Sequence, residues 1–244
     1  MYHFKSSSHI WLKGATELGG WAVHIKATYL HIRIYLFGVI GMILLGRLAD
    51  LIVSLSTKSI GGNRLSDGNI LLLILLCTAI VLPIRYFKRI IHLGASREQY
   101  FMGLHLSFAV WATGIALFNS CWYVLEVKVL RQYTGIIDMI EAFHWNEFGF
   151  AGTFVYQTAF YIMAMAFLSM LVSGYHHPAG WLLSALVITA IPVGTAFTSL
   201  RVHVASFFKT LLFNSSLPAG VAFNLVLYLL FVAGAWLFTR RRTH

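Results

Sequence analysis

Arg47 and Asp50 are ionisable residues that lie within one long apolar stretch of the chain. If that stretch is a helix, their spacing of three places both side chains on one face, where a guanidinium and a carboxylate can pair. Charges inside such stretches are costly and usually face a protein interior or a water-filled cavity. The pair is therefore a candidate for lining a substrate path. The alternative is an ion pair near the end of a long helix, with side chains that extend to the interface.

His176 and His177, followed by Pro178, occupy a short connection between two apolar stretches. Adjacent histidines point in different directions and chelate a metal poorly, and no Cys or carboxylate stands close by. Lysine followed by Ser or Thr occurs at 58–59 and 209–210 without the glycines of a phosphate-binding loop. The sequence therefore predicts no metal and no nucleotide cofactor on this chain. The two histidines form either a plain turn or a contact for a partner protein.

Residues 85–100 form a basic segment between two apolar stretches, with four Lys or Arg residues. Gly94 can adopt the left-handed conformation that closes a helix. Ser96 and Gln99 have the spacing of a capping box, in which each side chain satisfies a free backbone donor at a helix start. The sequence therefore predicts that one helix ends near Gly94 and that a short, separately capped helix begins at Ser96. Such a shape suits the docking of another protein.

The composition assigns the chain to the integral membrane proteins. Of 244 residues, 59% are hydrophobic and 11% are charged, whereas a soluble domain carries about 25% charged residues. The formal net charge is +10, but the Lys and Arg residues cluster at the ends of apolar stretches, which indicates membrane orientation and not nucleic-acid binding. Cys77 and Cys121 fall within these stretches and are expected to be packing residues. The length leaves room for a single transmembrane domain over residues 1–244.

Six stretches of roughly 20 residues or more can each cross a bilayer, so we predict an all-α membrane protein with six transmembrane helices. Their approximate bounds are 30–55, 69–87, 103–126, 151–173, 180–200 and 219–239. An even number of spans puts both termini on one side. With Arg47 set aside, that side holds eleven Lys and Arg residues and the other holds six. The positive-inside rule therefore predicts that both termini are cytoplasmic.

Three segments outside the predicted spans also carry apolar residues at helical spacing. Residues 1–29 are expected to include an amphipathic helix on the cytoplasmic leaflet; a helical extension of the first span is the alternative. Residues 129–148 and 201–213 are expected to lie in the outer interface, or to enter the membrane and return. The final span is expected to open at Pro218, because proline is well accommodated in the first turn of a helix.

The string LGASREQYFMG at 93–103, after an apolar span and a basic segment, resembles the cytoplasmic loop of bacterial ATP-binding-cassette exporter permeases. The resemblance is to the six-helix permeases of the second exporter superfamily (type V fold), including exporters of peptide toxins and bacteriocins. It implies that this loop carries a coupling helix that docks on a separate ATPase. By position, Gly94 would be the hinge beside Ala95. The docking helix would comprise Ser96, Arg97, Glu98, Gln99, Tyr100 and Phe101, with His176 and His177 as a further contact.

The same resemblance implies an amphipathic N-terminal helix, a re-entrant outer segment over 201–217 and a short basic C-terminus. It implies a homodimer or heterodimer of permeases with two ATPase subunits, which hold the ATP and Mg, in the bacterial plasma membrane. The cargo would be an amphipathic or hydrophobic molecule, with a membrane-active peptide as the preferred candidate. Two alternatives remain open: a membrane-embedded transferase, and a sensor or assembly subunit that transports nothing.

Overall fold

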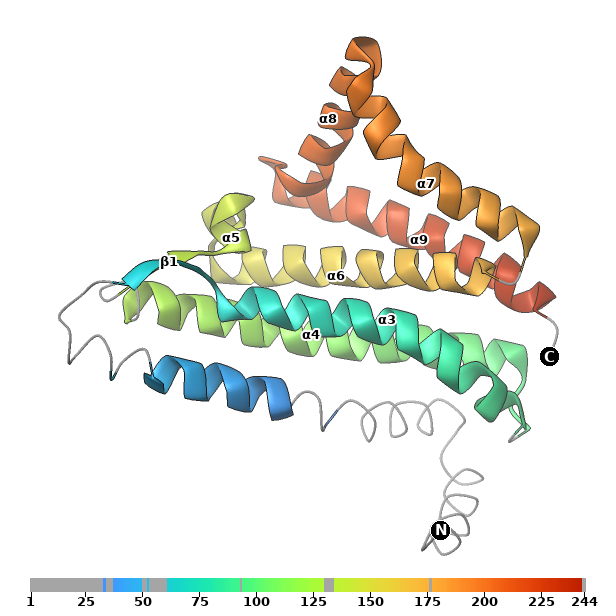
Figure 1. Ribbon diagram of the computed structural model, residues 1–244, viewed down its shortest axis with the longest axis horizontal. Helices are drawn as coiled ribbons and strands as arrows, with labels where there is room; N and C mark the ends of the chain where they lie inside the picture. Colours follow the sequence, from blue (N-terminus) through green and yellow to red (C-terminus); the bar gives the residue numbers. More distant parts are fainter. Residues whose placement is uncertain are drawn as a thin grey trace, which may run out of the picture.

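The computed structural model describes residues 37–49, 61–92, 94–129, 134–175 and 177–242, together with Arg33 and Ile52. The predicted interfacial helix within 1–29 lies outside the described residues. Asp50 and His176 also lie outside them. Element labels follow Figure 1.

The described chain is mainly helical, and five of its helices are long and apolar enough to cross a membrane. They comprise α3 (Asp67–His92), α4 (Arg97–Lys128), α6 (Gly149–Gly174), α7 (Pro178–Ala196) and α9 (Leu217–Arg241); in the case of α6 the apolar segment begins at Trp145. These helices overlap the last five predicted spans. Within the first predicted span, the structure describes the helix Phe37–Ala49. This helix is shorter than the roughly 20 residues that a bilayer requires. Six spans therefore remain a prediction.

Helices α3, α4, α6 and α9 run side by side and form the core of the molecule (Figure 1). On α3, Leu71, Leu75 and Leu82 are buried against α4 and α6, whereas Leu73, Ile80 and Ile84 are exposed. The apolar residues of α3 thus cover both faces, as expected of a helix that faces protein on one side and lipid on the other. Helices α6 and α9 approach closely at Gly220, where a Cβ atom would lie 2.3 Å from the ring of Tyr156.

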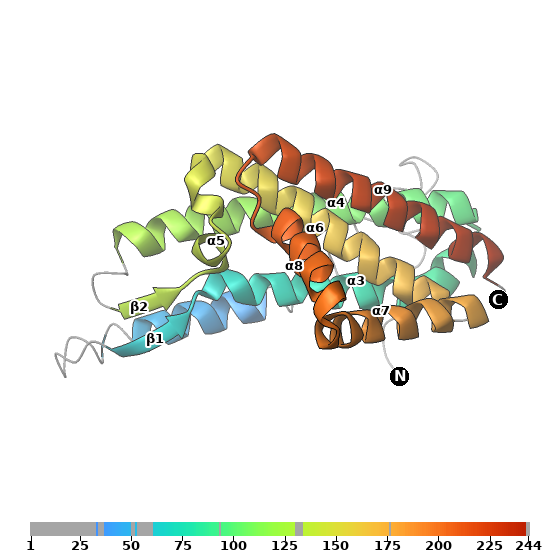
Figure 2. The same ribbon diagram turned by 90° about the horizontal axis from the view of Figure 1, so that it is seen from above.

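Helices α7 and α8 (Thr198–Leu212) form a hairpin that stands away from the other helices (Figures 1 and 2). They are separated at Phe197, which has the extended values φ −92° and ψ 123°. The end of α8 is held against α6, because Tyr156 Oη donates to Leu211 O at 2.9 Å. The helix predicted within 201–213 is confirmed. Whether residues 201–217 enter the membrane and return remains a prediction.

The segment 129–148 differs from the predicted amphipathic helix. Residues Thr134–Ile137 form strand β2, which pairs in parallel with β1 (Gly61–Leu65), with Leu65 opposite Ile137. The short helix α5 (Met139–Ala142) and the 3₁₀ helix η2 (Trp145–Phe148) follow. Two adjacent β-branched residues favour the strand, and the Asp138 side chain caps α5 by accepting from Ile140 N at 2.7 Å. The prediction of a helix through this connection is therefore wrong, whereas the all-α class holds for the bundle.

Candidate functional sites at the two ends of the bundle

The turn between α3 and α4 lies at the end of the bundle where α9 also ends (Figure 1), hereafter the basic end. Gly94 has φ +91°, as predicted. Its N–H donates to Ile91 O at 3.0 Å, and Ala95 N donates to Ile90 O at 3.3 Å. This pair of hydrogen bonds is the Schellman closure of a helix, which requires a left-handed residue and therefore favours glycine.

Ser96 begins the next helix with the predicted capping box. Its Oγ accepts from Gln99 N at 3.1 Å, and Ser96 N donates to Gln99 Oε1 at 2.9 Å. The prediction of a short, separate helix is wrong, because α4 continues from Arg97 to Lys128. No proline interrupts this sequence, so nothing stops the helix after its first turns. The candidate docking residues therefore form the start of a helix that is long and apolar enough to cross a membrane.

The side chains of this segment divide into an exposed set and a packed set. Exposed residues of the segment are Gly94, Ser96, Glu98 and Gln99. Tyr100 is buried edge-on against Phe87, with ring centroids 5.1 Å apart.

The packed set joins the turn to the end of α9. The ring of Phe101 lies 5.0 Å from that of Trp236, and Arg97 Nη1 donates to Arg240 O. His177 stacks on Phe238 at 6.1 Å and its carbonyl accepts from Gly180 N at the start of α7. The exposed residues of the turn can therefore meet a partner, while the packed residues connect that turn to α9.

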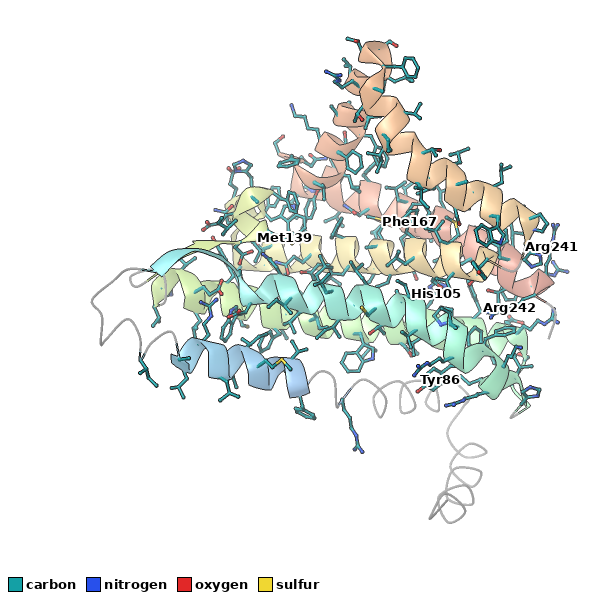
Figure 3. All side chains as sticks on the ribbon, in the orientation of Figure 1. Tyr86, His105, Met139, Phe167, Arg241 and Arg242 are labelled. Carbon is teal, nitrogen blue, oxygen red and sulfur yellow. The ribbon has the colours of Figure 1, made fainter. Side chains whose placement is uncertain are left out.

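The basic end carries seven Lys or Arg residues and one carboxylate, Glu98, among the described residues of α3, α4 and α9 and Arg242. Arg242 is buried: its Nη1 donates to Pro83 O at 3.1 Å and its guanidinium lies 4.3 Å from the centre of the Phe87 ring. Burial lowers the pKa of this guanidinium, but an arginine stays protonated at neutral pH. Figure 3 shows Arg241, Arg242 and Tyr86 together at this end.

The opposite end holds a partly buried ion cluster centred on Arg47. Its Nε donates to Asp67 Oδ2, at the start of α3, and its Nη2 donates to Glu126 Oε1 at 3.0 Å. Glu126 lies near the end of α4 and its side chain is 2% exposed. It accepts two further hydrogen bonds, from Ser66 Oγ at 2.7 Å and from Trp122 Nε1 at 2.8 Å. The cluster therefore ties the helix Phe37–Ala49 to α3 and α4.

Sequence reasoning identified Arg47 and missed both of these partners. Asp67 and Glu126 lie 20 and 79 residues away from it, so no local spacing reveals the contact. A usable signal did exist, because Glu126 is a carboxylate at the end of an apolar stretch, where a charge needs a partner. The cluster holds a cation between two anions and is suited to binding helices together.

A second polar network lies deeper, between α4 and α6. Asn119 Nδ2 donates to Gln157 Oε1 at 3.1 Å and to Tyr161 Oη at 3.3 Å. All three side chains are buried. Asn119 Oδ1 fills the space beside Gly68, where a Cβ atom would lie only 1.6 Å away. Both polar networks thus meet α3 within its first turn.

Within the part of the chain that the structure describes, no group of three His, Cys, Asp or Glu residues could hold a metal ion. Buried His105 instead packs against the rings of Phe101 and Phe108.

Comparison of the chain with protein-family profiles, with curated proteins and with solved structures finds no match.

Proposed function

We propose that this chain is the permease subunit of an ATP-driven exporter, with ATP hydrolysis on a separate partner subunit. The observation that carries the proposal is the capped turn at 94–99. It presents Ser96, Glu98 and Gln99 to solvent at one end of the bundle and begins a membrane-crossing helix. A partner that pushes on this turn moves α4 directly.

The contacts behind the turn support a path for that force. Arg97 donates a hydrogen bond to the carbonyl of Arg240, and Phe101 packs on Trp236. The end of α9 is therefore expected to move together with the start of α4. Helix α9 packs along α6 through Gly220. Displacement of the turn therefore moves the four core helices together, as expected when a transporter rocks between inward and outward states.

The order of elements also supports the proposal. Helix α8 lies between α7, which corresponds to the fifth predicted span, and the last long helix α9, which is the position expected for the re-entrant outer segment of such permeases. Both basic clusters lie at one end of the bundle, and we propose that this end faces the cytoplasm of a bacterial cell. Two copies, or one copy and a related permease, would then bind two ATPase subunits.

The proposed cargo is an amphipathic or hydrophobic molecule, with a membrane-active peptide as the preferred candidate. The described helices expose many large apolar side chains, such as Leu182 at 71% and Ile188 at 72% on α7. These surfaces suit contact with a hydrophobic cargo, and they suit contact with lipid equally well.

Co-purification tests this proposal. The tagged chain is expressed with the ATP-binding-cassette ATPase encoded beside its gene and extracted in mild detergent. We expect a stable complex in which the two chains have equal stoichiometry. A gene with no such neighbour, together with a chain that purifies without any ATPase, would overturn the proposal.

A further inference from the structure

Five exposed cations surround the basic end of the bundle and are named here the basic collar: Arg85, Lys88, Arg89, Arg240 and Arg241. None of them is in an ion pair within the described part of the chain. The described fold therefore leaves these five charges open to contact with an anionic ligand.

The two halves of the basic collar belong to helices that touch. Arg242, directly after Arg241, reaches α3 through its hydrogen bond to Pro83 O at 3.1 Å and its stacking on Phe87 at 4.3 Å. The contacts of Arg242 therefore join the segments that carry the three cations of α3 and the two of α9.

Each half of the basic collar ends an exposed apolar stripe. On α3, Leu73, Ile80 and Ile84 are 60%, 38% and 54% exposed, and Lys88 continues the same face one turn further. On α9, Val226, Leu230 and Leu237 are 55%, 61% and 57% exposed, and Arg241 follows one turn after Leu237. Apolar stripes that end in cations have the polarity of a phospholipid, with chains along the stripe and a phosphate at its end.

Two aromatic residues at the ends of neighbouring helices indicate that this part of the molecule lies at the depth of the lipid headgroups. Tyr175 and Trp181, at the end of α6 and the start of α7, are 59% and 56% exposed and pack together at 4.9 Å. Exposed Tyr and Trp are enriched at the level of the lipid headgroups. At that depth, headgroup phosphates would be within reach of the basic collar.

We propose that the basic collar binds the headgroups of anionic phospholipids, with phosphatidylglycerol as a representative ligand, while the acyl chains lie along α3 and α9. An acidic protein surface fits less well, because the cations extend the lipid-facing stripes and the exposed turn carries Glu98. The inference does not depend on the proposed exporter function.

The test measures lipid selectivity at the surface of the whole protein. The chain is reconstituted in phosphatidylcholine vesicles that contain a trace of spin-labelled phosphatidylglycerol or phosphatidylcholine, and electron paramagnetic resonance gives the motionally restricted fraction of each. We expect phosphatidylglycerol to associate at least about fivefold more strongly at low salt, since one basic residue near the surface contributes about that factor. High salt should reduce the preference.

Three variants identify the residues responsible. Replacing all five collar residues by Gln should bring the ratio of phosphatidylglycerol to phosphatidylcholine association close to one. Replacing the four arginines among them by Lys should retain the preference for phosphatidylglycerol. Lys128→Gln with Lys209→Gln, at exposed positions outside the basic end, should also retain it. Circular dichroism verifies that each variant is folded; the salt series and the control pair still test the proposal if the Gln variant fails.

Four results would overturn the proposal: no preference in the wild-type chain, an unchanged preference in the Gln variant, loss of the preference in the control pair, or its abolition by millimolar inorganic phosphate. The last result would indicate a site for free phosphate. A Gln variant that keeps its lipid preference but loses its ATPase would assign the collar to protein docking instead.

Discussion

Arg47 illustrates how one residue can determine the position of a whole element. Its helix exposes Leu44, Leu45 and Leu48, whereas Ile43 is buried and Val39 packs against the core. The pairing of Arg47 with Asp67 and Glu126 adds polar contacts from this helix to α3 and α4. A buried ion pair contributes little net stability, but loss of one partner leaves an uncompensated charge.

Removal of Arg47 should therefore be costly. We predict that Arg47→Ala lowers stability by about 3 kcal/mol or more, because two carboxylates lose their shared cation. Glu126→Gln should cost less, since Asp67 still neutralises Arg47. The measurement is the thermal unfolding midpoint in detergent, with exposed Lys128→Ala as the matched control. An Arg47→Ala midpoint equal to that of the control would contradict this account.

Gly94 is the second position where a single residue is decisive. Its φ of +91° makes a side chain unfavourable, so Gly94→Ala should lower stability by about 1–2 kcal/mol. Gly114 is the matched control, because it lies in the interior of α4 and an added Cβ atom there would meet nothing within 4 Å. Gly114→Ala should be neutral or stabilising. Equal effects of the two substitutions on the unfolding midpoint would argue against a left-handed turn at Gly94.

At the scale of elements, the packing of α6 on α9 depends on close approach at Gly220. Gly220→Ala places a methyl group against Tyr156, whose hydroxyl holds the end of α8. We predict a loss of about 1–3 kcal/mol, as is usual when a packed interface is overfilled. Gly234→Ala is the control, because its new methyl group meets the flexible end of Met170. Limited proteolysis near 213–216 should increase for Gly220→Ala alone.

The parts of the fold that depend on local chemistry could be predicted from the sequence. The end of α3 and the start of α4 follow from Gly94 and Ser96, because the conformational and capping preferences of these residues act over a few residues. The long helices follow from the length of the apolar stretches in the sequence. The β1–β2 pairing could not be predicted, because it joins few residues that are far apart in sequence. The sequence indicates that Glu126 needs a partner, but it does not identify that partner as Arg47.

The same distinction holds for the candidate docking segment. The capping box is local and was predictable, but the burial of Tyr100 against Phe87 and the packing of Phe101 on Trp236 depend on how α3 and α9 pack. Sequence reasoning therefore assigned six consecutive residues to one surface, whereas the fold divides them into an exposed set and a packed set.

At the scale of the whole molecule, the charge distribution predicts orientation. The basic end has the large excess of cations, whereas the described residues at the opposite connections include Asp67, Glu126, Asp138, Glu141 and Glu147. We expect the basic end to be cytoplasmic. In a background with Cys77 and Cys121 replaced by Ala, Glu147→Cys should react with a membrane-impermeant maleimide in intact cells. Glu98→Cys should react only after lysis, and the reverse pattern would contradict the orientation.

The central claim is that a separate ATPase acts on the exposed turn at the basic end. The most direct measurement is ATP hydrolysis by the ATPase reconstituted with this chain in vesicles, with Glu98→Lys compared with Glu147→Lys. Both side chains are exposed, and they lie at opposite ends of the bundle. Charge reversal inside an interface should weaken docking at least about tenfold, so we predict that Glu98→Lys lowers hydrolysis that depends on this chain while Glu147→Lys leaves it unchanged. Equal hydrolysis with both variants, or no effect of the chain on the ATPase, would contradict the account.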